Sequence, residues 1–383
     1  MPLLRLLRRT AVPVRVEWSQ PQRPLALRAW TSLPSLPHDA AETSSSAWSR
    51  MAIYSTAAAA VLAGAVCPQE VNSEQAPTIH KVAQPRDPYR AGGGSFTNDF
   101  DISRPLGAGA FGTVWQCMHR ASHASVAVKV VSESYEEAAR EKAALTCVAL
   151  AGGHANIVEL QHHYTYGGFH YLAFELVSGM TLFDLVRRRH RVDEAMKQVA
   201  RLVVAQVASA IAFLHSIGIV HCDLKPDNVM VTAANHVKLI DFGSASMPHP
   251  IDVTSMPAAT EKAEEDMSRL ASAPLSGTKS YWSPEMLQAK ATLVTVVPIM
   301  DMWAIGCILY IMLCGQHPFD PRGTLTEAQV IDNILHRPVQ FTQPVWATIS
   351  PETRLIVSQL LEKDPARRMT AADLVRALGN EAS

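Results

Sequence analysis

Paired cysteines are missing from this chain of 383 residues, which holds six cysteines and no Cys-x-x-Cys pair. Their absence argues against structural zinc and a disulfide framework, and it fits a reducing compartment. Excess charge is missing as well, because 34 lysines and arginines nearly balance 35 acidic residues, for a formal net charge of -1. We therefore expect no nucleic-acid partner bound by bulk electrostatics. Hydrophobic residues make up 48% of the chain, enough to bury the core of one large domain.

Lysine is absent from the first 38 residues, where six arginines stand beside a single acidic residue, Glu17. Leucines interleave with the first arginines, and an Arg-rich, acid-poor, amphipathic start is typical of an organelle presequence. We predict that residues 1–50 are such a presequence, which would direct the protein to the mitochondrion or another organelle. The alternative is a disordered basic tail on a cytoplasmic protein.

Charged residues are also absent from residues 51–69, which Arg50 and Glu70 bound. This length is near the lower limit for a membrane span, and the many alanines make the stretch only weakly hydrophobic. We interpret it as a weak membrane anchor or sorting segment, or else as a plain Ala-rich helix or linker. Residues 70–99 contain the run AGGGS at 91–95 and are predicted to be a flexible linker.

From Phe100 the pattern changes to short β-type runs and then to long helical ones. The sequence predicts strands over 100–105, 113–118, 125–131 and 171–177, with one helix over about 135–150 among them. Beyond Ser178 it predicts helices over 194–217, 300–314, 325–335 and 351–361. A small β-rich lobe followed by a larger helical lobe is the expected architecture.

A glycine-rich run, GAGAFGTV, occupies residues 107–114. Glycines let a backbone approach a phosphate without a side-chain clash. A dinucleotide-binding fold would need a helix directly after this run, whereas residues 113–118 continue as a strand. Lys129 follows in a β-run, seventeen residues after Gly112. A lysine buried there needs an anion such as the α/β-phosphates of a nucleotide; the alternative is a surface lysine on an edge strand.

Two further motifs follow in order: HCDLKPDN at 221–228 and Asp-Phe-Gly at 241–243. Together with the glycine-rich run and Lys129, their order and spacing resemble the signature of the eukaryotic-type Ser/Thr protein kinase family, over residues 100–378. The resemblance implies an α+β, bilobal protein-kinase fold. A small β-rich N-lobe with one main helix would span 100–177, and a larger, mainly helical C-lobe would span 178–378.

The resemblance also implies catalytic and metal-binding roles. Asp223 would accept the proton of the substrate hydroxyl, and Lys225 would steady the γ-phosphate of ATP. Thr278 would bridge these two residues, which is a trait of Ser/Thr kinases. Asn228 and Asp241 offer the oxygen atoms that a hard cation such as Mg²⁺ or Mn²⁺ prefers.

Lys129 should pair with a carboxylate of the N-lobe helix. Glu141 is the preferred partner, because Leu145 then falls one turn later on the same helix face, as the family's hydrophobic spine requires. Glu136 and Glu137 are the alternatives.

An ATP site between the lobes is implied as well. Glycine backbone would cover the phosphates, apolar side chains would sandwich the adenine, and hinge backbone would bond its edge, with Phe174 behind the base. The implied residues are Leu106, Gly107, Gly109, Gly112, Val114, Ala127, Lys129, Glu175, Val177 and Met230. For each apolar member, a place in the hydrophobic core is an equally good interpretation.

In the C-lobe, the run GTKSYWSPE at 277–285 resembles the segment that closes the family's platform for protein substrates. The resemblance implies a buried ion pair between Glu285 and Arg368, and it implies that Asp301 holds the backbone of the 221–228 loop. Residues 346–370 look most like the calcium/calmodulin-dependent group. No DxDxDG loop occurs, so intrinsic calcium sensing is not expected.

Three features depart from the family pattern. Cys222 replaces the arginine that usually precedes the catalytic Asp and pairs with a phosphate on the activation segment, so such a switch is less expected. The segment between Gly243 and Gly277 is long and is interpreted as a solvated insert or as a regulatory loop. Thr181 stands where many members that prefer basic peptides carry a glutamate.

The sequence therefore predicts an ATP-dependent Ser/Thr protein kinase that acts on protein substrates in signal transduction. The alternative from another class is a catalytically weak pseudokinase that serves as a scaffold. It is disfavoured because Lys129, Asp223, Asn228 and Asp241 are all present. A small-molecule kinase is disfavoured by Thr278 and the platform residues.

The presequence hypothesis predicts that residues 1–95, fused to a fluorescent protein, carry it into an organelle, because the arginines of residues 1–38 provide the import signal. Microscopy of living cells measures this, and a second fusion with those six arginines changed to glutamine is the control. A diffuse cytosolic signal from the unchanged fusion contradicts the hypothesis.

Overall fold

The computed structural model describes residues 96–109, 112–188, 192–247, 276–288 and 296–380. The presequence, the 51–69 segment and most of the 70–99 linker lie outside the described residues. So do Ala110 and Phe111 of the glycine-rich run, and residues 248–275 of the long segment after Gly243.

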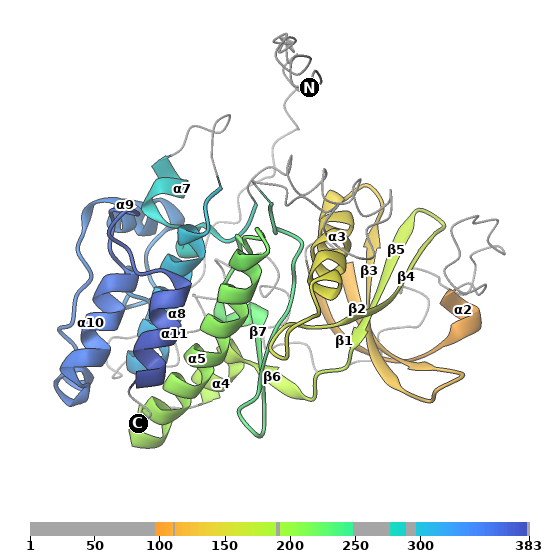
Figure 1. Ribbon diagram of the computed structural model, residues 1–383, viewed down its shortest axis with the longest axis horizontal. Helices are drawn as coiled ribbons and strands as arrows, with labels where there is room; N and C mark the ends of the chain where they lie inside the picture. The colour runs from red at the N-terminus through yellow and green to blue at the C-terminus, as the bar shows by residue number, and fades with distance from the viewer. Residues whose placement is uncertain (1–95, 110–111, 189–191, 248–275, 289–295, 381–383) are drawn as a thin grey trace, which may run out of the picture. The chain divides into compact units, whose positions relative to one another are not determined.

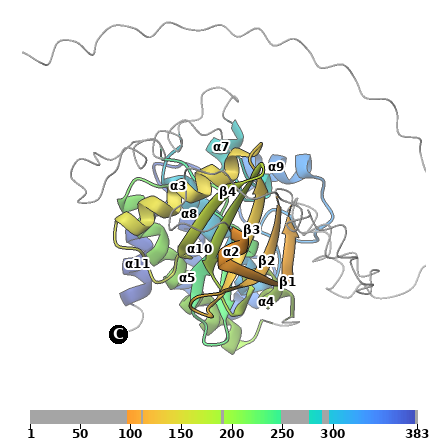
Figure 2. The ribbon, with the colours of Figure 1, turned by 90° about the vertical axis from the view of Figure 1, so that its right-hand side faces the viewer.

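The N-terminal part of the described chain is a five-stranded sheet with the strand order β1-β2-β3-β5-β4 (Figures 1 and 2). All neighbouring strands are antiparallel. The strands are β1 (Phe100–Gly109), β2 (Gly112–His119), β3 (Ser125–Ser132), β4 (Leu160–Tyr166) and β5 (Phe169–Glu175). One long helix, α3 (Glu136–Leu150), packs against β4 and β5. In β3 the buried Val126, Val128 and Val130 alternate with the half-buried Ala127 and Lys129, as expected for a strand with one face on a core.

Strand β4 was not predicted from the sequence. Its residues, LQHHYTY, lack the alternation of apolar and polar side chains that marks a half-buried strand. The reason is its place at the edge of the sheet, where it pairs only with β5 and most of its side chains stay partly exposed. The position of β4 is thus set by pairing with a neighbour and not by its own pattern.

The predicted linker also differs at its end from the structure. Phe96–Asp99 form a short helical turn, α2, and Phe96 is buried. The Phe96 ring stacks on Phe100, with centroids 5.4 Å apart, and on Tyr171, with centroids 4.7 Å apart. These aromatic contacts bring the end of the 70–99 segment into the core of the N-lobe.

The C-terminal part is mainly helical and carries one small antiparallel sheet. The sheet consists of β6 (Gly179–Thr181), β7 (Val229–Thr232) and β8 (Val237–Leu239). The helices are α4 (Leu182–Arg188), α5 (Glu194–Ser216), α7 (Pro284–Gln288), α8 (Ile299–Cys314), α9 (Glu327–His336), α10 (Pro351–Leu360) and α11 (Ala371–Asn380). The four long helices predicted from periodicity, α5, α8, α9 and α10, agree with the structure to within two residues at each end. The α+β class with two lobes is confirmed.

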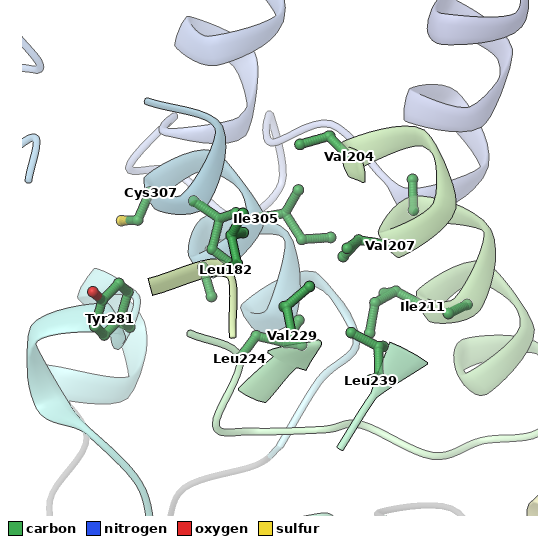
Figure 3. Packing of buried hydrophobic residues seen from close by; sticks show 14 of the residues in the cluster. Leu182, Val204, Val207, Ile211, Leu224, Val229, Leu239, Tyr281, Ile305 and Cys307 are labelled. Atoms are coloured by element: carbon green, nitrogen blue, oxygen red, sulfur yellow. The ribbon is translucent and has the colours of Figure 1, made fainter. Parts of the chain in front are cut away.

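Helix α8 forms the centre of the C-lobe. It is apolar on all sides and buried from Met300 to Leu313, as expected for a helix surrounded by others. Figure 3 shows Ile305 of α8 on the side of Leu182 and Val207, and Cys307 on the side of Tyr281. Among the described residues, α5 is long and apolar enough to cross a membrane, but it packs against α8, β8 and α11 as a core helix.

A single methyl group at Gly306 is predicted to disturb the contact between α8 and α10. A Cβ at position 306 would lie 2.8 Å from Leu361 Cδ2 and 2.9 Å from Leu360 Cβ, closer than non-bonded carbon atoms approach. We expect Gly306→Ala to lower the free energy of unfolding by about 1–3 kcal/mol. This loss would override the intrinsic preference of helices for alanine over glycine, about 1 kcal/mol. Thermal unfolding followed by circular dichroism measures the change.

The matched control is Gly379→Ala in α11, where no heavy atom lies within 4 Å of an added Cβ. The same substitution should there leave the melting temperature unchanged or raise it. A melting temperature for Gly306→Ala that is not below that of Gly379→Ala contradicts the close packing of α8 on α10.

Candidate active site

Three charged side chains from separate parts of the chain meet at Lys129. Strand β3 presents the lysine, whose Nζ lies 2.7 Å from Glu141 Oε2 in α3 and 2.9 Å from Asp241 Oδ1. Of the three glutamates considered from the sequence, Glu141 is the one that lies at this ion pair. Its second oxygen, Oε1, accepts a hydrogen bond of 3.3 Å from the backbone N–H of Phe242. Helix α3 is thereby tied both to β3 and to the Asp-Phe-Gly segment.

The charges in this cluster stabilise one another. Burial opposes the charged form of Lys129, but Asp241 and Glu141 together raise its pKa well above the usual value. Burial likewise opposes ionised Asp241, but Lys129 lowers its pKa to about 2. The pKa of Glu141 is raised by burial, although Lys129 favours its charged form. At neutral pH the lysine is therefore a fixed positive charge and Asp241 a fixed negative one.

A second cluster surrounds Asp223 in the buried loop 221–228. Asp223 Oδ2 accepts hydrogen bonds from Lys225 Nζ at 2.8 Å and from Asn228 Nδ2 at 3.2 Å, and Oδ1 accepts from the backbone N–H of Thr278 at 2.8 Å. Lys225 Nζ also donates to Thr278 Oγ1 at 2.8 Å. The structure thus brings together the four residues 223, 225, 228 and 278, which the sequence singled out.

Asp301 of α8 binds the backbone of this loop. Its carboxylate accepts hydrogen bonds from the N–H groups of His221 at 2.9 Å and Cys222 at 3.0 Å, and His215 Nε2 donates to it at 2.9 Å. Burial opposes the ionised form, but the hydrogen bond and charge of His215 lower the pKa of Asp301 below its usual range. Cys222 has φ of 66°, a left-handed conformation that an L-residue adopts only when its surroundings impose it.

The residues expected to contact ATP come from both sheets. Gly107 and Gly109 end β1, and Gly112 begins β2; a Cβ at Gly112 would lie 2.0 Å from the carbonyl oxygen of Val130, so only glycine fits there. Val114 pairs with Lys129 across β2 and β3, and Ala127 pairs with Phe174 across β3 and β5. Met230 lies in β7 opposite Thr181.

Several apolar residues of this set are only partly covered. Leu106 is exposed, and Val114, Ala127, Val177 and Met230 are half-buried. None of the five belongs to the hydrophobic clusters formed by the described residues. Their apolar surface is therefore left partly uncovered, and their contact with adenine stays a prediction.

The donor set suits Mg²⁺ bound together with substrate phosphates. The Asp241 side chain is 42% exposed and anionic. Asn228 donates from its amide nitrogen to the backbone and side-chain oxygens of Asp223, so its own side-chain oxygen faces no donor among these contacts and could bind a cation. No group of three or more His, Cys, Asp or Glu side chains suited to a metal occurs within the described ranges. Magnesium commonly takes one or two protein ligands and completes its shell with phosphate and water oxygens.

The sequence pattern of the protein kinase domain matches residues 100–377. The chain belongs to the protein kinase family. A serine/threonine-protein kinase of Phytophthora infestans is 34% identical over 320 residues, which cover 77% of this kinase and 74% of that protein.

Two further relatives belong to calcium-regulated kinases by name. A calcium-dependent protein kinase of Oryza sativa subsp. japonica is 31% identical over 77% of this kinase and 51% of its own length. A type II calcium/calmodulin-dependent protein kinase of Caenorhabditis briggsae is 32% identical over 72% and 48%. The kinase spans about half the length of these two relatives. Its predicted similarity to the calcium/calmodulin-dependent group is confirmed.

The ion pair expected in the C-lobe of the kinase is present. Arg368 donates to both oxygens of Glu285, at 2.6 and 2.8 Å, and its guanidinium lies 5.3 Å from the ring centre of Trp303. This pair fastens the end of the 277–285 run, which carries Thr278, to the helical core. It is a structural contact.

Sequence reasoning missed two charged residues near the site. Lys238 of β8 donates to Glu175 Oε1 at 2.6 Å, so the hinge side chain is tied to the strand that leads to Asp241. Arg140 of α3, which precedes Glu141, is buried and donates to Ser276 Oγ. A lysine inside a short apolar strand and an arginine on the buried face of a helix are the signals that could have revealed them.

Glu141→Gln tests the Lys129 cluster without a change in side-chain size. The lysine would lose its charged partner in α3, and we expect the kcat/KM for ATP to fall by roughly 10- to 100-fold, or about 1.4–2.7 kcal/mol. Steady-state kinetics of the purified chain with varied ATP measures the effect.

Glu136→Gln in the first turn of α3 is the control, since the Glu136 side chain is exposed. Its kinetics should match those of the unchanged protein. Equal kinetics for the Glu141 and Glu136 variants would show that the ion pair to Lys129 has no part in catalysis.

Proposed function

We propose that this kinase is catalytically active and transfers the γ-phosphate of ATP to Ser and Thr hydroxyls of proteins. The observation that carries the proposal is the set of 2.8 Å contacts of Lys225 with Asp223 and with Thr278. Asp223 and Lys225 lie on the loop held by Asp301, and Thr278 comes from the 277–285 run. Phosphoryl transfer needs positioning and charge neutralisation more than covalent help from the protein. This arrangement supplies both.

Asp223 is proposed to orient the acceptor hydroxyl and to take its proton. Thr278 N–H, Lys225 and Asn228 already donate to the two carboxylate oxygens, so the side chain has a fixed direction before substrate arrives. Preorganised groups of this kind lower the barrier because they need not reorient during the reaction. Lys225, which contacts both Asp223 and Thr278, supplies a positive charge beside the proton acceptor.

Lys129 is proposed to hold the α- and β-phosphates of the nucleotide. Glu141 and Asp241 keep its ammonium group charged and fix its position. Asn228 and Asp241 would hold Mg²⁺ or Mn²⁺, which when bound neutralises part of the phosphate charge. The partly covered apolar residues Val114, Ala127 and Met230 would take the adenine.

A protein substrate is supported by the platform segment. Arg368 and Glu285 hold the 277–285 run against the core, and that run carries Thr278 into contact with the catalytic residues. Thr181 Oγ1 accepts a hydrogen bond from the N–H of Asp184, so it caps α4 and presents no carboxylate of its own. We therefore propose no strict requirement for a basic residue at the subsite where other members carry a glutamate.

The scaffold alternative lacks a supporting observation. Pseudokinases usually lose the nucleotide lysine, the catalytic Asp or the metal-binding Asp. Here Lys129, Asp223 and Asp241 are present, and Lys129 forms its ion pair with Glu141. We further propose that residues 1–50 direct this kinase to the mitochondrion or another organelle, and that 51–69 is a sorting segment or weak anchor. A role in signal transduction follows from the proposed protein substrates.

The proposed activity predicts that the purified full chain transfers labelled phosphate from ATP–Mg²⁺ to Ser and Thr residues of a mixed protein substrate. Asp241→Asn should lower the rate at least about 100-fold, because it removes a metal-binding charge that positions the phosphates. Removal of Mg²⁺ with the chelator EDTA should abolish phosphate transfer. The measurement is scintillation counting after separation of the proteins, followed by phosphoamino-acid analysis.

Asp332→Asn, a surface residue that pairs with His336, is the matched control and should keep full activity. Nucleotide binding without label transfer by the unchanged chain would favour the scaffold. Label on tyrosine alone would contradict the Ser/Thr assignment.

A further inference from the structure

His317 is a buried histidine that the mechanism above leaves without a role. It lies in the run GQHPFD at 315–320, which follows α8, and it is only 2% exposed. Both of its ring nitrogens contact backbone groups. Nε2 lies 3.1 Å from the carbonyl oxygen of Ser280, and Nδ1 lies 3.3 Å from the backbone nitrogen of Phe319. The ring therefore joins its own turn to the 277–285 run.

The two contacts require one protonation state of the His317 ring. The N–H of Phe319 can only donate, so Nδ1 is an acceptor without a proton. The carbonyl of Ser280 can only accept, so Nε2 carries the proton and donates. Burial favours this neutral form and lowers the pKa of His317 to about 4, although the Ser280 carbonyl favours the charged form. At neutral pH the ring thus acts through a directed hydrogen bond and not through charge.

The turn that carries His317 is fastened to the helical core. Gly315 ends α8 in a left-handed conformation, with φ of 73°. The Phe319 ring stacks on Trp303 of α8, with centroids 5.4 Å apart, and the Phe319 carbonyl accepts from Asn333 Nδ2 of α9 at 2.9 Å. The backbone group that orients Nδ1 is therefore itself held by α8 and α9, and the His317 ring has a fixed position.

The partner of His317 belongs to the run that carries Thr278. Ser280 is the middle residue of a 3-10 turn over Lys279–Tyr281, and the N–H of Tyr281 donates to the Thr278 carbonyl at 3.0 Å. The rings of Tyr281 and His317 meet edge to face, with centroids 5.4 Å apart. His317 thus contacts two consecutive residues of this turn, and Thr278 stands directly before it, in contact with the catalytic loop.

The middle of the 277–285 run depends on this contact. The start of the run is bound to the catalytic loop through Thr278, and its end is bound by Arg368. Between them Lys279 pairs with Glu327 at 3.4 Å, but both side chains are about half exposed, and such pairs contribute little. Loss of the donor at His317 would leave a buried carbonyl without this hydrogen bond, which is unfavourable.

We propose that His317 is a positioning residue for the protein substrate, which fixes the middle of the 277–285 run so that the acceptor hydroxyl meets Asp223. It acts through the backbone of Ser280 and the ring of Tyr281 and touches neither substrate nor nucleotide. The Lys129 cluster lies on β3, α3 and the Asp-Phe-Gly segment, so the effect falls on the protein substrate and not on ATP. The inference rests on the proposed kinase activity.

Two amide variants of His317 separate the roles of its ring nitrogens. In His317→Gln the side-chain N–H has about the reach of Nε2 and still donates to the Ser280 carbonyl, whereas His317→Asn reaches only to the place of Nδ1 and still accepts from Phe319. The protein probe is a mixture of dephosphorylated casein and histone. We expect kcat/KM for this mixture to fall at least about 10-fold in His317→Asn and to stay within about 3-fold in His317→Gln.

The KM for ATP should stay within about 2-fold in both variants, because uniform loss of structure would change both substrates and loss of positioning changes one. Steady-state kinetics of the full chain measures these constants. Equal kcat/KM for the protein mixture in the Asn and Gln variants overturns the proposal. So does a parallel loss for ATP and protein in His317→Asn together with a lower melting temperature, since that is a general structural role.

A surface histidine provides the matched control. The His336 side chain in α9 is 69% exposed and pairs with Asp332 one turn earlier. His336→Asn should keep both constants within about 2-fold, since exposed pairs of this kind contribute little. Should His317→Asn fail to fold, His317→Phe takes its place, because it keeps a ring against Tyr281 and lacks the donor. The same selective loss is expected there, and an unaltered kcat/KM for the protein mixture overturns the proposal.

The activity of the unchanged chain is measured first and separates the two levels of the argument. Turnover by the unchanged chain together with unaltered kinetics in His317→Asn overturns the role of His317 and leaves the kinase assignment intact. Absence of turnover in the unchanged chain overturns the proposed function and with it this inference.

Discussion

The carboxylate of Asp301 is buried in the most apolar of the described helices, α8, and it accepts hydrogen bonds from two consecutive backbone N–H groups of the catalytic loop. Burial of an ionised carboxylate is unfavourable unless such donors surround it. The two hydrogen bonds therefore stabilise one backbone geometry of the loop. The carboxylate of Asp301 holds Cys222 in a left-handed conformation, and this backbone conformation sets the direction in which the Asp223 side chain points. The contacts of Asp223 with Lys225, Asn228 and Thr278 all depend on that direction.

The nucleotide side of the site depends on a second buried charge cluster. Lys129, Glu141 and Asp241 lie in a strand, a helix and a loop, and their opposite charges offset part of the cost of burying one another. Removal of one member would leave the remaining charges partly buried and uncompensated. The cluster thus couples the position of α3 to the N-lobe sheet and to the Asp-Phe-Gly segment. Correct placement of α3 becomes a condition for binding phosphates.

Arg140 extends this coupling from α3 to the substrate side. The helix carries Glu141 toward the nucleotide and Arg140 toward Ser276, so one rigid element contacts both halves of the catalytic centre.

The sequence by itself determined the identity and the order of the chemical groups. Motif spacing indicated the family, and the glycines, Lys129, Asp223, Asn228 and Asp241 were found because phosphate and metal chemistry restricts those positions to few residue types. The periodicity of apolar residues gave the long helices, since a helix buried on one or all sides carries its pattern in its own residues. The edge strand β4 and the helices α4, α7 and α11 were missed, because strand pairing or tertiary packing defines them. The sequence favoured Glu141 over Glu136 and Glu137 as the partner of Lys129, and the structure contains that pair. Only the tertiary structure decided that Arg140 contacts Ser276 and that Lys238 holds Glu175. These contacts join residues 136 and 63 positions apart, and local sequence does not encode which of several equivalent charges will meet.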